Sequence, residues 1–300
     1  MKRRMATIAP RHTKRRTVHP KTVLEKNKYT EINFIGTTHD GLLYDAIDEK
    51  GAPIFIKVYW HMSRMCNDYA RETKIFKLIR EAPPESTTVL MHDNKIITTS
   101  KFTIIVMPKL EMELFDYVST GLVDSLIHGL NMSKNIVKCV KEFHSLGFAH
   151  LDICMENILV HENVLRLFDY GLAKKLGEPI YCPYHGRPNY KAPELIKYDE
   201  IISSPSLDVY SIGILIYTIL TGVAMYSDLH DTHYNAIRRC KKLFPHKFIT
   251  PNIEKLILEI ISVNPSDRPS IDEIDRRLNS IIASVSDVSI VDLPDAQSTL

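Results

Sequence analysis

The first third of the chain alternates apolar and polar residues in short runs separated by glycine and aspartate. A period of two residues is typical of β-strands, because successive side chains of a strand point to opposite faces. Residues 66–80 instead place apolar side chains at helical spacing among charged ones, which predicts the main helix of this part. We predict strands at residues 29–35, 42–47, 54–59, 88–91, 95–98 and 102–107.

Beyond about residue 110 the apolar residues follow mainly the helical period. One helix is expected to begin at the N-cap Ser133 and to bury Ile136, Val137, Val140 and Phe143. Apolar runs at 158–160 and 165–168 predict a small hairpin. Further helices are predicted at 192–198, 206–222, 232–243, 251–262 and 270–281. Strands followed by helices indicate an α+β fold with two lobes.

Residues 209–227 form a run without any charged residue, and nineteen residues are close to the length of a membrane span. The run contains three tyrosines, two serines and two threonines, and Asp208 and Asp228 flank it. These polar residues favour a helix buried in a large core over a membrane span. We therefore predict no membrane association.

Charge is distributed unevenly along the 300 residues, although the net charge is only +2. Residues 1–21 hold eight lysines and arginines and no acidic residue. We predict a disordered basic arm at 1–28. Five cysteines without a C-x-x-C pair indicate a reduced, intracellular protein without a zinc module, and the lack of an apolar segment near residue 1 argues against a secretory signal.

Residues 35–43 carry two glycines, Gly36 and Gly41, between two predicted strands, with Thr38 where a third glycine would help. Glycines let a backbone turn tightly and point its N–H groups at phosphates. Taken alone, such a segment is more often just a hairpin turn.

The order of the motifs is more specific than any one of them. After the glycines come a strand that ends in Lys57, Glu72 in the predicted helix, His150–Asn157, Asp169-Tyr170-Gly171, Ala192-Pro193-Glu194, Asp208–Gly213 and Asn264–Pro269. This series strongly resembles the signature set of eukaryotic-type protein kinases of the Ser/Thr subtype, from residue 29 to about 282. The resemblance implies a bilobal fold with an N-lobe and hinge at 29–110, a helical C-lobe at 111–282 and a tail at 283–300.

The resemblance also implies ATP and Mg²⁺ as cofactors and gives each motif a task. Lys57 would contact the α- and β-phosphates while paired with Glu72, and Asp152 would orient the substrate hydroxyl. Asn157 and Asp169 would hold Mg²⁺, and Met107 would be the gatekeeper beside the hinge. The residues implied around ATP are Gly36, Gly41, Leu43, Phe55, Lys57, Glu72, Met107, Lys109, Leu110 and Glu113.

Structural tasks are implied for three more residues. Asp208 is expected to anchor the backbone of the catalytic loop from the buried helix. Glu194 and Arg268 are expected to form a buried pair that ties the activation segment to the helical lobe.

The catalytic segment departs from the family pattern at several positions. Leu151 replaces the arginine that normally pairs with a phosphorylated activation segment, and residues 169–194 contain no serine or threonine. We hypothesise that activity does not require phosphorylation of this segment. Cys154 replaces a lysine beside the transferring phosphate, and Arg187 is proposed to supply that charge as a catalytic residue. The alternative is an exposed Arg187 and an impaired site.

Phe55 stands where the family has a small alanine above the adenine, so it can crowd the base or stack on it. Together with Thr38 and Cys154 it keeps a second interpretation open. In that interpretation the chain is a pseudokinase scaffold that binds partners without phosphoryl transfer.

Glu113 and Glu156 lie where kinases that prefer basic substrates bind arginines, which predicts protein substrates that are basic around the acceptor, unless both are ordinary exposed carboxylates. The triplets Lys2-Arg3-Arg4 and Lys14-Arg15-Arg16 resemble a bipartite signal for a nuclear import receptor within residues 2–16. A solvated tail and, more weakly, nucleic-acid binding are the alternatives. We expect a location inside the cell, in the nucleus, the cytoplasm or both.

Two stretches are distinctive within the kinases, residues 57–60 and residues 106–117. They resemble the Ser/Thr kinases encoded in the unique short region of alphaherpesviruses, which implies a viral protein that acts in a host cell.

Overall fold

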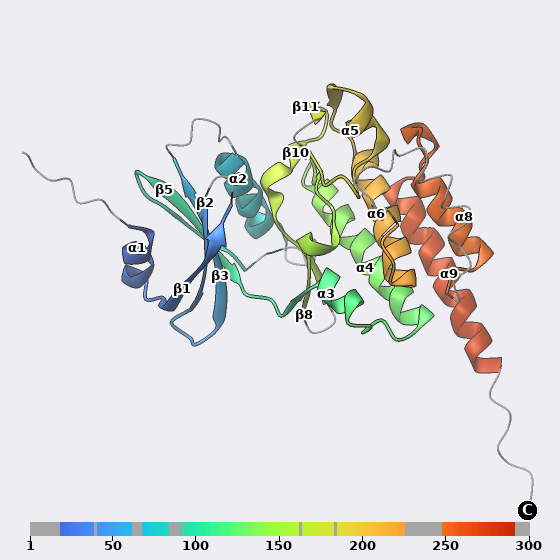
Figure 1. Ribbon diagram of the computed structural model, residues 1–300, viewed down its shortest axis with the longest axis horizontal. Helices are drawn as coiled ribbons and strands as arrows, with labels where there is room; N and C mark the ends of the chain where they lie inside the picture. Colours follow the sequence, from blue (N-terminus) through green and yellow to red (C-terminus); the bar gives the residue numbers. More distant parts are fainter. Residues whose placement is uncertain are drawn as a thin grey trace, which may run out of the picture.

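The computed structural model describes residues 19–38, 41–61, 68–83, 91, 93–161, 164–182, 185–225 and 248–291 of the chain. Two lobes lie side by side along the long axis of the molecule (Figure 1). The predicted α+β, bilobal architecture is confirmed. The predicted helix at 232–243 and the predicted strand residues 88–90 lie outside the described residues.

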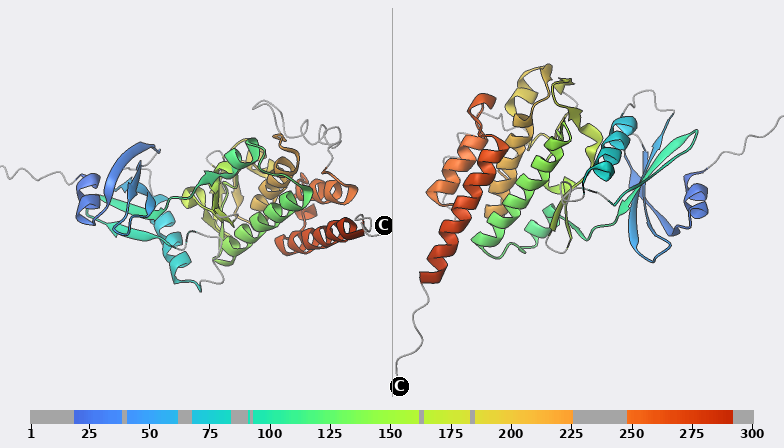
Figure 2. Two further views of the ribbon diagram at one scale, coloured as in Figure 1. Left: turned by 90° about the horizontal axis from the view of Figure 1, so that it is seen from below. Right: turned by 180° about the vertical axis from the view of Figure 1, so that it is seen from behind.

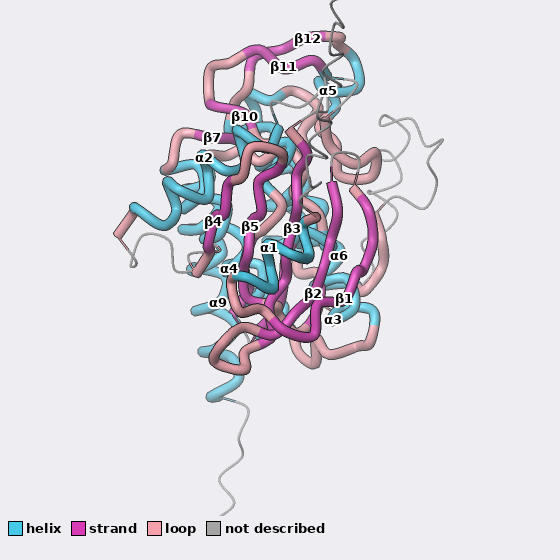
Figure 3. Tube along the Cα trace, turned by 90° about the vertical axis from the view of Figure 1, so that its left-hand side faces the viewer, coloured by secondary structure: helices cyan, strands magenta, loops and turns pink. Residues whose placement is uncertain are grey.

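The smaller lobe is a five-stranded antiparallel sheet in the order β1-β2-β3-β5-β4, with one long helix, α2 (Asp68–Glu81), against it (Figures 1 and 3). Five of the predicted strands are confirmed with small shifts of their ends. The sixth is not, because Met91, its only described residue, belongs to no strand. The strands are β1 (Thr30–Thr37), β2 (Gly41–Ile47), β3 (Pro53–Trp60), β4 (Lys95–Thr98) and β5 (Phe102–Pro108).

The two faces of this sheet have different partners, and β3 shows the alternation. Ile54, Ile56 and Val58 point to one face and form a separate apolar cluster that includes Leu24 of helix α1 (Pro20–Lys26). Phe55 packs against the main core, and Lys57, on the same face as Phe55, reaches α2. Figure 3 shows α1 in front of the sheet, on the side away from the larger lobe.

Helix α1 corrects the predicted boundary of the basic arm at residue 28. The side chain of Leu24 is fully buried against the sheet, and Pro20 at the start of the helix presets the backbone angle that a helix needs. Residues 20–26 are therefore helical, although the sequence prediction places them in the disordered arm.

The larger lobe is built around α4 (Leu126–Ser145) and α6 (Pro205–Thr221), which pack against each other (Figure 2). Its other helices are α3 (Leu114–Ser119), α5 (Pro193–Lys197), α8 (Pro251–Ile260) and α9 (Ile271–Val291), with short 3-10 turns at Met155–Asn157, Tyr170–Leu172 and Pro265–Asp267. Its short strands are β6 (Met112–Glu113), β7 (Phe148–Ala149), β8 (Ile158–His161), β9 (Val164–Leu167), β10 (Lys174–Lys175), β11 (Pro179–Tyr181) and β12 (Glu200–Ile202).

Two helix boundaries differ from the sequence prediction. Helix α4 begins after Ser125, whose hydroxyl accepts from the backbone N–H of His128, whereas Ser133 lies inside the helix and donates to the carbonyl of Gly129. The predicted buried face of α4 is confirmed. Helix α9 continues to Val291, so residues 283–291 of the segment predicted as a tail at 283–300 belong to the helix.

The uncharged run around α6 is a core helix, as predicted. From Leu207 to Leu220 every residue of α6 is buried, with α4 and α8 packed against it. None of the helices in the described part of the chain combines the length and the apolarity that a membrane span needs.

Candidate active site

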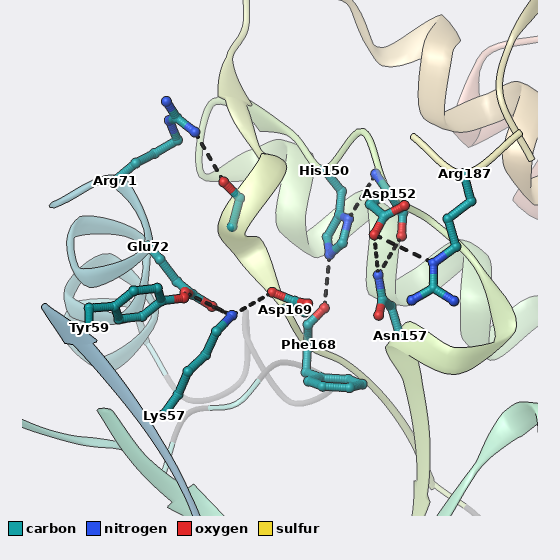
Figure 4. A network of polar contacts seen from close by, with 11 residues as sticks. Lys57, Tyr59, Arg71, Glu72, His150, Asp152, Asn157, Phe168, Asp169 and Arg187 are labelled. Carbon is teal, nitrogen blue, oxygen red and sulfur yellow. Dashed lines mark hydrogen bonds and ion pairs between the residues drawn. The ribbon is translucent and has the colours of Figure 1, made fainter. Parts of the chain in front are cut away.

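A buried lysine between two carboxylates lies where the two lobes meet (Figure 4). The Nζ of Lys57 on β3 is 3.2 Å from Oε2 of Glu72 on α2 and 2.8 Å from Oδ1 of Asp169. Tyr59, two residues along the same face of β3, donates its hydroxyl to Glu72. The three charged residues come from three distant parts of the sequence, and the predicted Lys57–Glu72 pair is present.

These neighbours set the protonation of the three groups. Burial alone would lower the pKa of Lys57, but the carboxylates of Glu72 and Asp169 outweigh it and raise the pKa. Burial raises the pKa of Glu72 to about 7 against the opposing effect of Lys57. For Asp169 the lysine prevails over burial and lowers the pKa. At neutral pH the lysine is therefore charged and held by at least one ionised carboxylate.

The residue after Asp169 locks this arrangement from the other side. Tyr170 is fully buried, its ring contacts Phe76 of α2 and stacks on Phe143 of α4 with centroids 5.1 Å apart, and its hydroxyl donates to the carbonyl of Leu167. Asp169 itself has φ +58°, a left-handed conformation that turns its carboxylate toward Lys57. Arg71 adds a hydrogen bond of 3.0 Å to the carbonyl of Gly171.

The loop that carries Asp152 is fixed from α6. The buried carboxylate of Asp208 accepts from the backbone N–H groups of His150 at 2.7 Å and Leu151 at 2.8 Å, and it contacts His144. Leu151 has φ +65°, a conformation that costs a leucine about 1–2 kcal/mol. The two hydrogen bonds to Asp208 hold this strained turn and so determine where Asp152 points, in the anchoring role predicted for Asp208.

Asp152 and Asn157 form the centre of the catalytic loop. The amide nitrogen of Asn157 donates to the Oδ2 of Asp152 at 2.8 Å and to its backbone carbonyl at 2.9 Å. The other oxygen of Asp152, Oδ1, is buried and has no hydrogen-bond partner. Burial raises the pKa of this carboxyl, which makes it a better proton acceptor than an exposed aspartate.

Comparison with known proteins decides what this arrangement belongs to. A family model described as the protein kinase domain matches residues 29–277. The chain belongs to the protein kinase family.

Several curated kinases are similar in sequence to part of this chain. The SNF1-like protein kinase ssp2 of Schizosaccharomyces pombe is 28% identical over 209 residues, 69% of this chain and 35% of that protein. The serine/threonine-protein kinase pim-2 of Danio rerio is 32% identical over 165 residues, 54% of this chain and 51% of that protein. Maternal embryonic leucine zipper kinase of Xenopus tropicalis is 33% identical over 166 residues, 53% of this chain and 25% of that protein. The chain thus spans about a quarter to a half of these relatives.

Asn157 and Asp169 offer oxygen atoms of the kind that would suit a bound metal ion. Both hydrogen bonds of the Asn157 side chain to Asp152 use the amide nitrogen, which leaves its oxygen as an acceptor, and Asp169 is an ionised carboxylate. Such hard oxygen atoms suit Mg²⁺, which takes its other ligands from phosphates and water. No cluster of three or more His, Cys, Asp or Glu side chains in the described ranges could hold a metal by itself.

Most of the residues that the sequence predicts around ATP lie on β1, β2, β3 and the end of β5. Gly41 is required by close packing, because a Cβ there would lie 1.8 Å from the carbonyl oxygen of Val58, whereas a Cβ at Gly36 would meet nothing within 4 Å. Thr38 donates its backbone N–H to the carbonyl of Gly41. Gly41 therefore has a structural reason to be glycine besides any contact with a nucleotide.

The large side chain at Phe55 lies on the face of β3 that meets the main core, and it is half-buried there. It faces the gatekeeper Met107 across the β3–β5 pair and Asp45 across the β2–β3 pair. Leu43 pairs with Lys57 in the same register, and Leu110 packs half-buried against the core. The hinge residue Lys109 forms an ion pair of 2.7 Å with Asp45, which links the hinge to β2.

Arg187 approaches the catalytic loop from the activation segment (Figure 4). Its Nη1 is 2.8 Å from Oε1 of Glu156, and its Nε is 3.9 Å from Oδ2 of Asp152. Cys154 is buried beside these residues, and burial raises the pKa of its thiol, so it carries no charge. A guanidinium from the opposite loop thus stands beside the catalytic aspartate, as the sequence predicts.

Carboxylates gather next to Arg187. Burial raises the pKa of Glu113, and the nearby charges of Asp116 and Glu156 add to this, while Arg187 opposes it. The second oxygen of Glu156, Oε2, has no hydrogen-bond partner. Glu113 and Glu156 thus lie close to one guanidinium, with Asp116 near Glu113, and we call this acidic group the negative corner of the site.

The activation segment of the kinase is held by contacts of its own. Lys191 donates to the carbonyl of Cys182 at 2.8 Å, His185 is 2.9 Å from the carbonyl of Tyr181, and β11 pairs with β12. Its end is fixed by Glu194, which receives two hydrogen bonds of 2.7 Å from Arg268. The buried pair predicted from the sequence is therefore present.

Four residues of the network were not predicted as part of the site: Tyr59, Arg71, His144 and Tyr170. Tyr59 could have been found, because it is two residues from Lys57 and a strand places both on one face. Arg71 and His144 act through partners 100 and 64 residues away in the chain, and Tyr170 contacts Phe76 of α2 from the far side of the site; sequence spacing does not indicate such partners.

Proposed function

We propose that the chain is an ATP- and Mg²⁺-dependent protein kinase that phosphorylates serine and threonine residues of protein substrates. The observation that carries the proposal is the free Oδ1 of Asp152 beside an Oδ2 held at 2.8 Å by Asn157. A fixed carboxylate with one oxygen that accepts no hydrogen bond can orient a hydroxyl and take its proton. The name of the pim-2 relative supports the preference for serine and threonine.

The other charged residues divide the remaining work. Lys57 would bind the phosphates of ATP, and its pairs with Glu72 and Asp169 keep its ammonium charged and in place. Asn157 and Asp169 would hold Mg²⁺, which neutralises charge on the phosphates when it is bound. Residues Gly36, Gly41, Leu43, Phe55, Met107, Lys109 and Leu110 would surround the nucleotide.

Arg187 is proposed to replace the positive charge that Cys154 cannot supply. Its contacts with Asp152 and Glu156 keep the guanidinium close to the place where the phosphoryl group would pass. An electrostatic group that is already in position stabilises the charge that develops during transfer.

We further propose that the kinase acts without phosphorylation of its activation segment. The bonds from Lys191 and His185 and the β11–β12 pair order this segment from within. The segment from 169 to 194 offers no serine or threonine, and Leu151 cannot bind a phosphate.

Substrates with basic residues near the acceptor are the class that fits the negative corner at Glu113, Asp116 and Glu156. Arg187 contacts only one of these carboxylates at hydrogen-bond distance, Oε1 of Glu156 at 2.8 Å, so it neutralises only part of this charge. A substrate arginine would make charge-assisted bonds there. We also propose an intracellular, nuclear or cytoplasmic location, an import receptor for residues 2–16 and a viral origin, on the sequence patterns alone.

A transfer assay tests the proposal against the pseudokinase alternative, which the large side chain of Phe55 favours. The purified chain is given labelled ATP, Mg²⁺ and a basic serine peptide, beside Asp152→Asn and Lys57→Met variants. Transfer by the wild type, with at least about a hundredfold loss in either variant, is expected. Equal labelling by all three chains, or none by the wild type together with no ATP-dependent rise in melting temperature, would overturn it.

A further inference from the structure

Tyr59 contacts both members of the buried Lys57–Glu72 pair (Figure 4). Its hydroxyl donates to Oε2 of Glu72, and the Nζ of Lys57 lies 5.2 Å from the centre of its ring. The side chain is 3% exposed and belongs to the main core, together with Ile75 and Phe76 of α2. One side chain of β3 therefore contacts the lysine, the glutamate and the core beside the helix that carries the glutamate.

The buried carboxylate of Glu72 depends on donors other than the lysine. Glu72 is 1% exposed, and a buried carboxylate is costly unless its oxygens receive hydrogen bonds. Lys57 is shared, because its Nζ is 2.8 Å from Oδ1 of Asp169 but 3.3 Å and 3.2 Å from the two oxygens of Glu72. The backbone of Tyr170 donates to Glu72 from the turn after Asp169, whereas the Tyr59 hydroxyl comes from the strand of Lys57 itself. Tyr59 thus fixes the carboxylate relative to the lysine.

The lysine has a further task in the proposed reaction, and the tyrosine does not. An ammonium group has three hydrogens, and Lys57 has Asp169 and Glu72 as their acceptors. A hydrogen bond from Lys57 to a phosphate of ATP would use a hydrogen that now points to a carboxylate. The hydroxyl of Tyr59 remains with Glu72 in either case, and its ring attracts the ammonium group by a cation–π contact.

We propose, on the basis of the proposed function, that Tyr59 is a positioning residue of the kinase. Its hydroxyl holds Glu72, and through Glu72 it holds Lys57 in the place where the phosphates of ATP would bind. The hydroxyl links β3 to α2 within the chain, so it would keep the helix in place whether or not a nucleotide is bound. The pair of lysine and glutamate is then set by the fold itself.

The first test follows α2 in the chain without nucleotide, so it does not depend on phosphoryl transfer. Tyr59→Phe keeps the ring and its packing and removes only the hydroxyl. We expect amide hydrogen exchange in α2 to become at least about fivefold faster, with exchange in α4 unchanged. The matched control is Tyr44→Phe, which removes the hydroxyl of a buried tyrosine on the outer face of the same sheet and should leave α2 unchanged. Unchanged exchange in α2 of Tyr59→Phe, or equal acceleration by both variants, would overturn the proposal.

The second test determines whether the hydroxyl acts through Glu72. We expect Tyr59→Phe to lower kcat/KM for ATP at least about tenfold, because it removes a hydrogen bond to a charged group, and to leave KM for a basic serine peptide unchanged. In a Glu72→Ala background the same change should have less than about a twofold effect. An equal loss in both backgrounds would overturn the positioning role. A wild type that transfers no phosphate would overturn the proposed function instead, while exchange in α2 and calorimetric binding of ATP would still decide the role of the hydroxyl.

Discussion

The two sides of the active site are built from different kinds of interaction. On the nucleotide side, Lys57 and Glu72 are almost fully buried and lie at the positions that the family pattern gives them. On the acceptor side, Leu151, Cys154 and Arg187 all depart from that pattern, and the Arg187 side chain is 41% exposed. The chain thus keeps the family's residues on the proposed nucleotide side and departs from them on the proposed acceptor side.

Burial accounts for this difference. A buried charge needs its partner at short distance, because leaving it unpaired costs several kcal/mol, so the nucleotide side tolerates few alternatives. A half-exposed charge is solvated wherever it is attached, so a guanidinium can reach the same space from another loop. The acceptor side can therefore change its residues while it keeps its charge.

The largest effect is expected at the buried pair of Glu194 and Arg268, which fixes the end of the activation segment. Arg268 lies under Glu194 with its side chain 1% exposed, and the Glu194→Ala variant leaves that guanidinium without its carboxylate. We expect the free energy of unfolding to fall by about 3–5 kcal/mol in urea denaturation. The matched control is Glu273→Ala, which removes the partner of the exposed Arg276 and should not move the midpoint. Equal midpoints for both variants would contradict the assignment of the anchor.

Arg187→Ala should have the next largest effect, this time on catalysis. Its distance of 3.9 Å from Asp152 and its partial exposure predict a smaller loss than a buried donor would give, about tenfold in kcat. Arg187→Lys should recover part of the rate, because it keeps the charge without the geometry. The steady-state rate with saturating ATP measures this. An unchanged kcat in the alanine variant would remove Arg187 from catalysis and make the acceptor side an impaired one.

A smaller effect is expected from pH on the nucleotide side. The pKa of Glu72 is raised to about 7, so lowering the pH from 8 to 6 protonates this carboxylate and removes one partner of Lys57. Activity should fall several-fold over this interval, and no further, because the lowered pKa of Asp169 keeps the second partner ionised. The Glu72→Gln variant, slower throughout, should lose this part of the pH dependence. A pH profile identical in both chains would assign the titration to another group.

The charged centre could be predicted from the sequence, because its residues occur in the order and at the spacing of the family motifs. These residues are Lys57, Glu72, Asp152 and Asp169. The sequence did not indicate how α4 begins, since Ser125 and Ser133 are both plausible caps. Only packing decides between them, and the hydroxyl of Ser133 is used inside the helix by the carbonyl of Gly129. Helix α1 was missed for a related reason, because its stability depends on the burial of Leu24 against a distant sheet.

The contacts of Arg187 mark the limit of the sequence argument on the acceptor side. Its position beside Asp152 could be expected from the family pattern, whereas its shorter pair with Glu156 follows from the path of the activation segment. That path is set by Lys191, His185 and the β11–β12 pair, whose partners lie up to about twenty residues away. Local sequence does not encode such distances, so the negative corner became visible only in the structure.

The last prediction is that kcat does not change on removal of phosphate. It tests whether the activation segment is held in place by its own contacts. We expect treatment with a Ser/Thr phosphatase and a tyrosine phosphatase to leave kcat for a basic peptide unchanged, because Lys191 and His185 bind backbone carbonyls that remain after any phosphate is removed. Loss of phosphate from a phosphothreonine peptide and a phosphotyrosine peptide added to the same sample would prove that the phosphatases worked. If phosphatase treatment lowers the activity and preincubation with ATP restores it, the activation segment carries a functional phosphate. The tyrosines would then be the residues to map, since residues 169–194 contain no other hydroxyl side chain.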